Sequence, residues 1–140
     1  MVPKEKALEF ISGLGVGIDF TRRDIQRKLR DKNQPWELSK AFEQSAPVGP
    51  FISPEKISSS ILPLELNISL SVNGKIKQQA NTRDMIFSVS EIISDLSAFF
   101  TLLPGDLVFT GTPQGVGPVF PGDVLEARID ELPCLSVAIQ

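Results

Sequence analysis

The chain has 140 residues, the length of one ordinary domain, and Leu, Ile, Val and Phe make up about a third of it, enough for an apolar core. The formal net charge of −3 gives no reason to expect a nucleic-acid partner, and no apolar run approaches the ~18 residues of a membrane span. There is no histidine and Cys134 is the single cysteine, which excludes a histidine-based zinc site, a Ser-His-Asp triad, an internal disulfide and a cysteine metal cluster within this chain. With no secretory signal in view, we expect a soluble cytoplasmic domain without a membrane partner.

The first forty residues carry an excess of basic side chains, which suits either an anionic small molecule or a solvated helix face. Residues 4–12 have apolar side chains at helical spacing, and this predicts a short helix that ends at Gly13. The strongly charged residues 21–32 predict a second helix or a turn-rich segment. Between them, glycines alternate over 13–17 without a phosphate-loop lysine. We interpret this as an extended strand against which another group packs closely, rather than as a nucleotide loop.

The middle of the chain has the clearest strand pattern. Apolar and polar residues alternate over 64–72, which predicts a half-buried strand, and Asn73-Gly74 predicts a type I′ turn into a returning strand. Residues 88–100 place their apolar side chains on one helical face, which predicts a core helix, and Ser88 and Glu91 have the spacing of a capping box.

The last third contains two Pro-Gly-Asp turns, at 104–106 and 121–123. A strand-like run follows each turn, at 107–111 and 124–129, and residues 135–139 form a further run. Repeated strand–turn–strand units with one core helix predict an α+β fold that is mainly antiparallel β.

Without histidine or a reactive cysteine, chemistry depends on carboxylates, cations and hydroxyls. Asp19 ends the glycine-rich strand between two apolar neighbours, where it is either a cap for the next helix or a ligand for a hard cation. Arg23 and Gln26 lie about one helical turn apart, so both can point at one spot. Arg23 can equally form a surface ion pair with Asp19 or Asp24, which would contribute less than ~1 kcal/mol.

Two further features can hold an anion. Lys40 lies in a partly apolar stretch, as either a desolvated lysine that polarises a carboxylate or enolate, or a surface lysine. Residues 110–117 (TGTPQGVG) combine two threonines with three glycines, so their hydroxyls and backbone amides can bind a carboxylate or phosphate, unless they form a simple turn. They lack a Walker lysine, which argues against a nucleoside triphosphate.

Four strings together resemble the fumarylacetoacetate hydrolase family, nearest to its acylpyruvase and oxaloacetate decarboxylase-like branch. They are GVGIDFTRRDIQ (15–26), PWELSKAFEQSAPVGPF (35–51), LSVNGKIKQQANTRDMIFSVSEIISDLS (70–97) and LLPGDLVFTGTPQGVGPVFPGDVLEARI (102–129). The resemblance implies a mixed β-roll or sandwich of the family's C-terminal domain type over residues 1–140. It also implies a Mg²⁺ or Mn²⁺ cofactor, C–C bond hydrolysis or decarboxylation of a short oxo-acid, and a homodimer.

The same resemblance implies a role for individual residues. Asp19 matches the family's aspartate metal ligand, and Arg23 and Gln26 match a substrate-facing arginine and glutamine. Lys40 matches the lysine of an L-x-K-[SA]-F string, and Thr112 matches the threonine of a G-T-P-x-G turn. We therefore expect Lys40 and Arg23 to be catalytic, Gln26 and Thr112 to bind substrate, and Asp19 to bind the metal.

The chain also departs from the family pattern. The family's Glu-x-Glu pair and its histidine–glutamate dyad lie upstream of the matched region, and residues 65–67 (ELN) form no such pair. We therefore expect the C-terminal two-thirds of a domain whose N-terminal strands are missing, with open sheet edges that promote self-association. Two alternatives stay open: a catalytically silent assembly subunit of the same fold, and an isomerase of a related oxo-acid.

Overall fold

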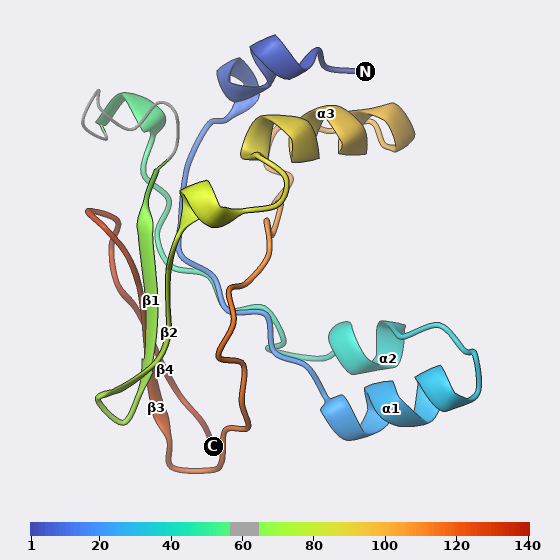
Figure 1. The fold of residues 1–140 in the computed structure, drawn as a ribbon, viewed down its shortest axis with the longest axis vertical. Helices are drawn as coiled ribbons and strands as arrows, with labels where there is room; N and C mark the ends of the chain where they lie inside the picture. Colours follow the sequence, from blue (N-terminus) through green and yellow to red (C-terminus); the bar gives the residue numbers. More distant parts are fainter. Residues whose placement is uncertain (57–64) are drawn as a thin grey trace.

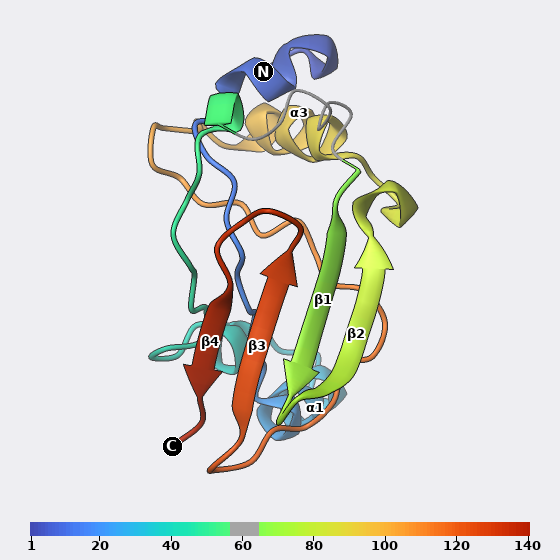
Figure 2. The same ribbon diagram turned by 90° about the vertical axis from the view of Figure 1, so that its left-hand side faces the viewer.

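The computed structural model describes residues 1–56 and 65–140. In this part of the chain, a four-stranded antiparallel sheet in the order β2-β1-β3-β4 forms one side of the molecule (Figure 2). Its strands are β1 (Asn67–Val72), β2 (Lys75–Asn81), β3 (Val124–Ile129) and β4 (Leu135–Ala138). The described α-helices are α1 (Arg23–Asp31), α2 (Glu37–Lys40) and α3 (Val89–Phe99), and short 3₁₀ helices cover Lys4–Phe10, Pro54–Lys56 and Thr82–Asp84. This confirms the predicted fold class; Leu64 of the predicted first strand lies outside the described residues.

The hairpin between β1 and β2 turns where the sequence predicts it. Asn73 has φ of 50° and Gly74 has φ of 74°, the two positive values of a type I′ turn. The Asn73 side chain also bonds the start of β3, donating to Asp123 Oδ1 at 2.7 Å and accepting from the Val124 N–H at 2.9 Å. The hairpin tip is therefore held to the neighbouring strand.

The glycine-rich segment is extended and closely packed, as expected. It runs antiparallel to residues 45–52, through bonds such as Leu14 N–H to Ile52 O at 2.9 Å. A Cβ atom on Gly15 would lie 3.0 Å from the Phe51 ring. Because these side chains are missing, aromatic rings lie directly on the backbone. Next to them, a small core forms between this segment and the sheet, from Val16, Ala127 and Leu132 with their half-buried apolar neighbours.

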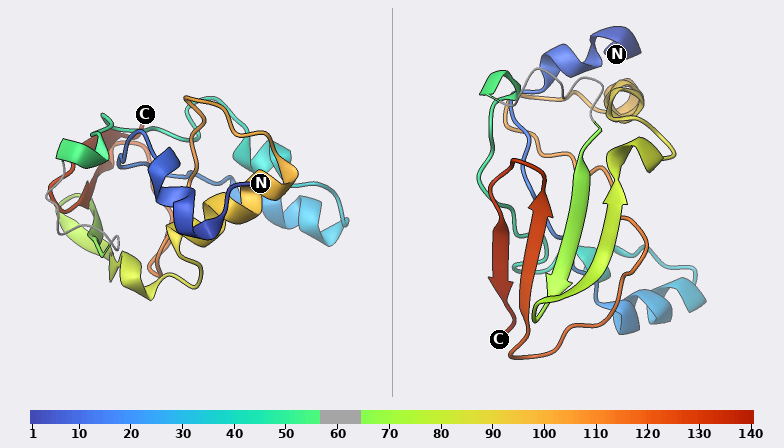
Figure 3. Two further views of the ribbon diagram at one scale, coloured as in Figure 1. Left: turned by 90° about the horizontal axis from the view of Figure 1, so that it is seen from above. Right: turned by 60° about the vertical axis from the view of Figure 1, so that its left-hand side comes forward.

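The helices lie at opposite ends of the molecule, α3 with the N-terminal 3₁₀ helix at one end and α1 with α2 at the other (Figures 1 and 3). The capping box of α3 is present, with Ser88 and Glu91 bonding each other's backbone N–H groups. Lys4 Nζ lies 2.6 Å from Glu91 Oε1, which ties the N-terminal segment to α3. The first predicted helix therefore exists, but as a 3₁₀ helix ending at Phe10.

Two expectations from the sequence are wrong, one about the burial of α3 and one about a strand after the first Pro-Gly-Asp turn. The end of α3 does not enter a core, because Phe99 and Phe100 are 76% and 64% exposed. Residues 107–111 form no strand and pair with none of the strands in the described sheet.

None of the described helices is long and apolar enough to cross a membrane. The cytoplasmic location stays a prediction.

Candidate functional site

Asp19 and Lys40 form an ion pair, with Lys40 Nζ donating to Asp19 Oδ2 at 2.7 Å. The backbone on both sides of Asp19 is held in place, because the N–H groups of Ile18 and Phe20 donate to Pro47 O at 3.0 Å and Ser45 O at 2.8 Å. The Asp19 and Lys40 side chains are 50% and 38% exposed. An ion pair that open to water stabilises a fold by only about 0–1 kcal/mol, so its contribution to folding is small.

Lys40 is the last residue of α2, and the helix is anchored by the residue before it. Ser39 is fully buried, and its carbonyl accepts a hydrogen bond from the Arg22 N–H at 3.0 Å. The Arg22 guanidinium lies over the Phe42 ring, 4.3 Å from its centroid. These contacts hold the end of α2 against the entry of α1, which fixes the backbone that carries Lys40. Lys40 is thus half-buried, which is intermediate between the desolvated lysine and the surface lysine that the sequence allowed.

Arg23 and Gln26 lie together on the first turn of α1. Arg23 Nη1 donates to Gln26 Oε1 at 2.7 Å, so the expected common direction of the two side chains is present. The alternative, in which Arg23 pairs with Asp19 or Asp24, is not found among the ion pairs of the described residues. The substrate role of both residues stays a prediction.

Thr112 is exposed in its glycine-rich turn, and it is bonded to the sheet through a residue that the sequence alone did not single out. The Gln78 side-chain amide donates to Thr112 Oγ1 at 2.9 Å and to Pro113 O at 2.8 Å. Gln78 is a polar residue at a core-facing position of β2, paired with Leu70 of β1. A polar residue at a core-facing position of a strand was the feature of the sequence that could have pointed to Gln78.

The segment leading to Thr112 also contacts the extended glycine-rich segment that precedes Asp19. A Cβ atom on Gly17 would lie 2.7 Å from Phe109 Cε1, so the Phe109 ring lies on the backbone two residues before Asp19. The structure therefore brings Asp19 into contact with Lys40, and Arg23 with Gln26. It also places the segment before Thr112 against the glycine-rich segment before Asp19.

A divalent cation needs more ligands than this site offers. Mg²⁺ takes six oxygen ligands in near-octahedral geometry. The described residues contain no cluster of three histidine, cysteine, aspartate or glutamate side chains that could hold a metal, and Asp19 Oδ2 is already bonded to Lys40. The described residues alone therefore do not fit a dedicated metal site, although a carboxylate oxygen is the ligand type that such an ion prefers.

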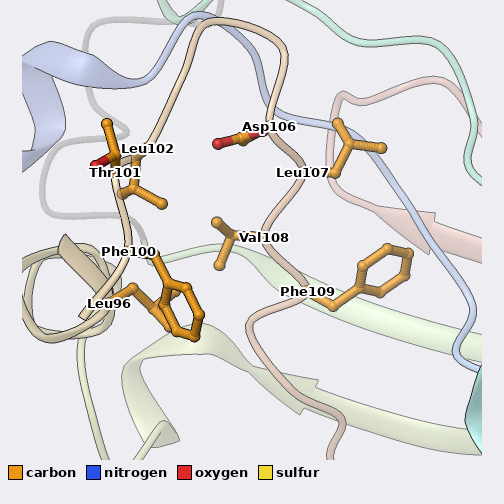
Figure 4. Close-up of a pocket in the computed structure, with 8 residues that line it drawn as sticks. All are labelled: Leu96, Phe100, Thr101, Leu102, Asp106, Leu107, Val108 and Phe109. Carbon is orange, nitrogen blue, oxygen red and sulfur yellow. The ribbon is translucent and has the colours of Figure 1, made fainter. Parts of the chain in front are cut away.

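An open pocket of about 440 Å³, lined mostly by apolar residues, lies away from these residues, between the end of α3 and the first Pro-Gly-Asp turn (Figure 4). Its single carboxylate, on Asp106, accepts a hydrogen bond from the Leu103 N–H at 2.7 Å and so stabilises the turn. None of the predicted site residues lines this pocket. The Asp19–Lys40 region therefore stays the candidate site.

Comparison with known proteins identifies the family. The family model for the fumarylacetoacetate (FAA) hydrolase C-terminal domain matches residues 1–140. The chain belongs to the fumarylacetoacetate hydrolase family. Its fold agrees with that of a member of known structure, the fumarylpyruvate hydrolase of Pseudomonas aeruginosa in complex with Mn²⁺ and pyruvate, with a TM-score of 0.93 and 46% identity over 99% of this chain and 58% of that chain.

Two curated members are similarly close in sequence. The oxaloacetate tautomerase YcgM of Escherichia coli is 44% identical over 91% of this chain and 57% of its own length. The fumarylpyruvate hydrolase of a Ralstonia species is 38% identical over 99% of this chain and 70% of its own length. The chain spans about three-fifths of the length of most of the curated relatives it matches. The predicted β-roll stays a prediction.

Proposed function

We propose that this chain carries the substrate-binding part of an enzyme that acts on a short oxo-acid, by C–C bond hydrolysis, decarboxylation or tautomerisation. The observation that carries the proposal is the Lys40 ammonium held at 2.7 Å by Asp19, on anchored backbone at one end of the molecule. The names of the relatives support the substrate class, since they include an oxaloacetate tautomerase and fumarylpyruvate hydrolases. The tautomerase name also favours the isomerase alternative within the same family.

The side chains present suit this substrate class. An ammonium has three N–H donors, and Asp19 takes one of them, so Lys40 keeps two for the carboxylate or carbonyl oxygen of a bound oxo-acid. Gln26 accepts from one nitrogen of Arg23 and leaves the rest of the guanidinium for the substrate. C–C cleavage and tautomerisation both move negative charge onto an enolate oxygen, and fixed cations nearby stabilise that charge.

We propose a divalent cation, Mg²⁺ or Mn²⁺, as the cofactor of the complete enzyme, with Asp19 as one of its ligands. The Mn²⁺ in the Pseudomonas relative supports a divalent ion. Bound there, the ion would act as a Lewis acid for the developing charge. A calorimetric Mn²⁺ titration of the complete enzyme tests this proposal: binding that Asp19→Asn weakens supports Asp19 as a ligand, and binding of equal strength in Asp19→Asn contradicts it.

The turnover experiment uses oxaloacetate and an acylpyruvate, each followed by ultraviolet absorbance, with pyruvate release measured in parallel. Lys40→Met should lower turnover by about 100-fold or more, because it removes the cation beside the developing charge. Lys28 lies on the exposed face of α1, so Lys28→Met is the matched control. This variant should have the turnover of the unaltered chain. Asp19→Asn should abolish the dependence on added Mg²⁺ or Mn²⁺. Equal turnover in Lys40→Met and Lys28→Met contradicts the proposal.

A catalytically silent assembly subunit is the second candidate, and the exposed apolar surface beside α3 favours it. The exposed apolar side chains there are Phe99, Phe100 and Leu103, each 63% exposed or more. Patches of this kind promote association, so we propose self-association, most simply as a homodimer. Sedimentation velocity should show a species larger than the 15.3 kDa chain, and a monomer at all concentrations contradicts this proposal.

A further inference from the structure

Gln78 is a buried amide on a strand that is otherwise mostly exposed. The residue is 8% exposed, whereas Lys75, Lys77 and Gln79 of the same strand are open to water. Burying an amide without partners costs free energy, so its hydrogen bonds have to be made within the protein. Both partners found for its nitrogen lie in the glycine-rich turn at 110–117, 34 and 35 residues further along the chain.

The orientation of this amide follows from chemistry. The Pro113 carbonyl can only accept a hydrogen bond, so the Gln78 atom that lies 2.8 Å from it must be the nitrogen. The second hydrogen of that nitrogen then points to Thr112 Oγ1 at 2.9 Å. Thr112 therefore accepts from Gln78, and the hydrogen of its own hydroxyl is directed elsewhere. Thr112 is exposed, so this hydrogen is available to a ligand.

A second contact independently fixes the same turn to β2. Gly115 has φ of +100°, and a Cβ atom on it would lie within 2.1 Å of Lys77 O and 3.3 Å of Gln78 Cγ. A side chain there would overlap the strand, so the turn lies directly on the backbone next to Gln78. Figure 2 shows the segment that contains the turn passing beside β2. The turn is therefore held at two points.

We propose that Gln78 is a positioning residue, which fixes the Thr112 hydroxyl as a hydrogen-bond donor toward an oxygen of the bound oxo-acid. The inference rests on the proposed function, because it assigns the ligand of Thr112. It adds a residue of β2 to a site otherwise built from the Asp19–Lys40 region. Gln78 itself does not touch the ligand.

The first experiment tests the positioning without any ligand, by ¹H–¹⁵N spectroscopy of the full chain. The side-chain amide hydrogens of Gln78 should exchange with solvent at least about 10-fold more slowly than those of Gln79, its exposed neighbour, since buried and bonded groups are protected. Gln78→Met should move the amide signals of Thr112 and Gly115, whereas Gln79→Met should leave them in place. Equal exchange rates for Gln78 and Gln79 overturn the proposal.

The second experiment measures binding of pyruvate, in the presence of Mn²⁺, to the chain and its variants. Thr112→Val and Gln78→Met should each weaken binding about 10-fold, which is typical of one lost hydrogen bond to a charged group, and the double variant should be no weaker than either. Thr112→Ser keeps the hydroxyl and should restore most of the affinity. Additive losses, or a loss in Gln78→Met without one in Thr112→Val, overturn the proposal.

Gln78→Glu distinguishes positioning from a merely structural role. As a carboxylate, residue 78 can no longer donate and instead accepts the hydroxyl hydrogen of Thr112, so pyruvate binding should weaken at neutral pH and recover as residue 78 is protonated at lower pH. A pH-independent loss contradicts positioning. If the unaltered chain binds no pyruvate at all, the proposed function fails, and the exchange measurement alone then decides whether Gln78 fixes Thr112.

Discussion

The two Pro-Gly-Asp turns have the same local structure and different surroundings. In each, the aspartate carboxylate accepts from the N–H three residues earlier, at 2.7 Å for Asp106 and 2.8 Å for Asp123. The glycines have φ of 96° at Gly105 and 92° at Gly122, the positive value that a type II turn needs at that position. After the second turn, β3 pairs with β1 and β4, whereas the residues after the first turn pair with no described strand.

The segment after the first turn is nonetheless extended. Figure 4 shows Val108 pointing toward Phe100 at the end of α3, while Leu107 and Phe109 point to the other side. Side chains alternate in this way along a strand. Because no described strand lies beside this segment, its backbone groups form no strand-to-strand hydrogen bonds and its apolar side chains stay exposed. The conformation of a turn thus depends on its own four residues, whereas a strand forms only where another strand pairs with it.

The largest expected difference between the two regions is in apolar burial. Leu125 of β3 is 1% exposed, and Leu107 after the first turn is 55% exposed. Leu125→Ala should lower the free energy of unfolding by about 2–5 kcal/mol, and Leu107→Ala by less than about 1 kcal/mol. Urea unfolding of both variants measures this. An equal loss for Leu107→Ala would mean that the segment after the first turn is packed in solution.

The aspartates of the two turns should differ by a smaller amount. Asp123 accepts a second hydrogen bond, from Asn73 Nδ2 at 2.7 Å, which connects the turn to the β1–β2 hairpin. Asp123→Ala should therefore cost about 1–2 kcal/mol and Asp106→Ala about 0.5–1 kcal/mol in the same unfolding experiment. Asn73→Ala should remove most of the difference between them. If the difference persists in the Asn73→Ala background, that hydrogen bond is not its cause.

The glycines of the two turns should behave alike. No atom lies within 4 Å of the position of an added Cβ at Gly105 or Gly122, so only the positive φ opposes a side chain. Gly105→Ala and Gly122→Ala should each cost about 1 kcal/mol. Unequal losses in thermal unfolding would show that the turns themselves differ, and not only the segments after them.

The smallest effect concerns the start of α3, the helix that leads to the first turn. The Lys4 ammonium, with the backbone N–H and hydroxyl of Ser88, lowers the pKa of Glu91 from 4.5 to about 2. The unfolded chain binds this proton more tightly, so the stabilisation is present above about pH 4.5 and is lost as the pH falls toward 2. Glu91→Gln should remove this part of the acid dependence, seen in denaturant unfolding at several pH values. An acid dependence parallel to that of the unaltered chain contradicts the assignment.

The features that the sequence predicts correctly are those set by a few neighbouring residues. The Asn73-Gly74 turn, the Ser88–Glu91 capping box and the Arg23–Gln26 contact depend only on local spacing. Residues 107–111 and the end of α3 could not be assigned correctly in this way, because their pairing and burial depend on what packs against them.

The site residues divide in the same way. Asp19 and Lys40 are 21 residues apart, so each could be singled out from its own sequence surroundings and from the family resemblance, but their contact could not be predicted from spacing. Gln78 and Thr112 are 34 residues apart and meet only when the turn lies on β2. The residues proposed to face the substrate came from the sequence patterns and the family resemblance, whereas the role proposed for Gln78 rests on its contacts in the fold.

The most direct test of the central claim is a calorimetric titration of the chain and of Lys40→Met with pyruvate in the presence of Mn²⁺. We predict saturable binding by the chain and at least about a 10-fold weaker affinity for Lys40→Met, because the variant lacks the cation that we propose to bind the oxo-acid. Saturable binding of equal strength in both proteins would contradict the account, since it would place the oxo-acid away from Lys40.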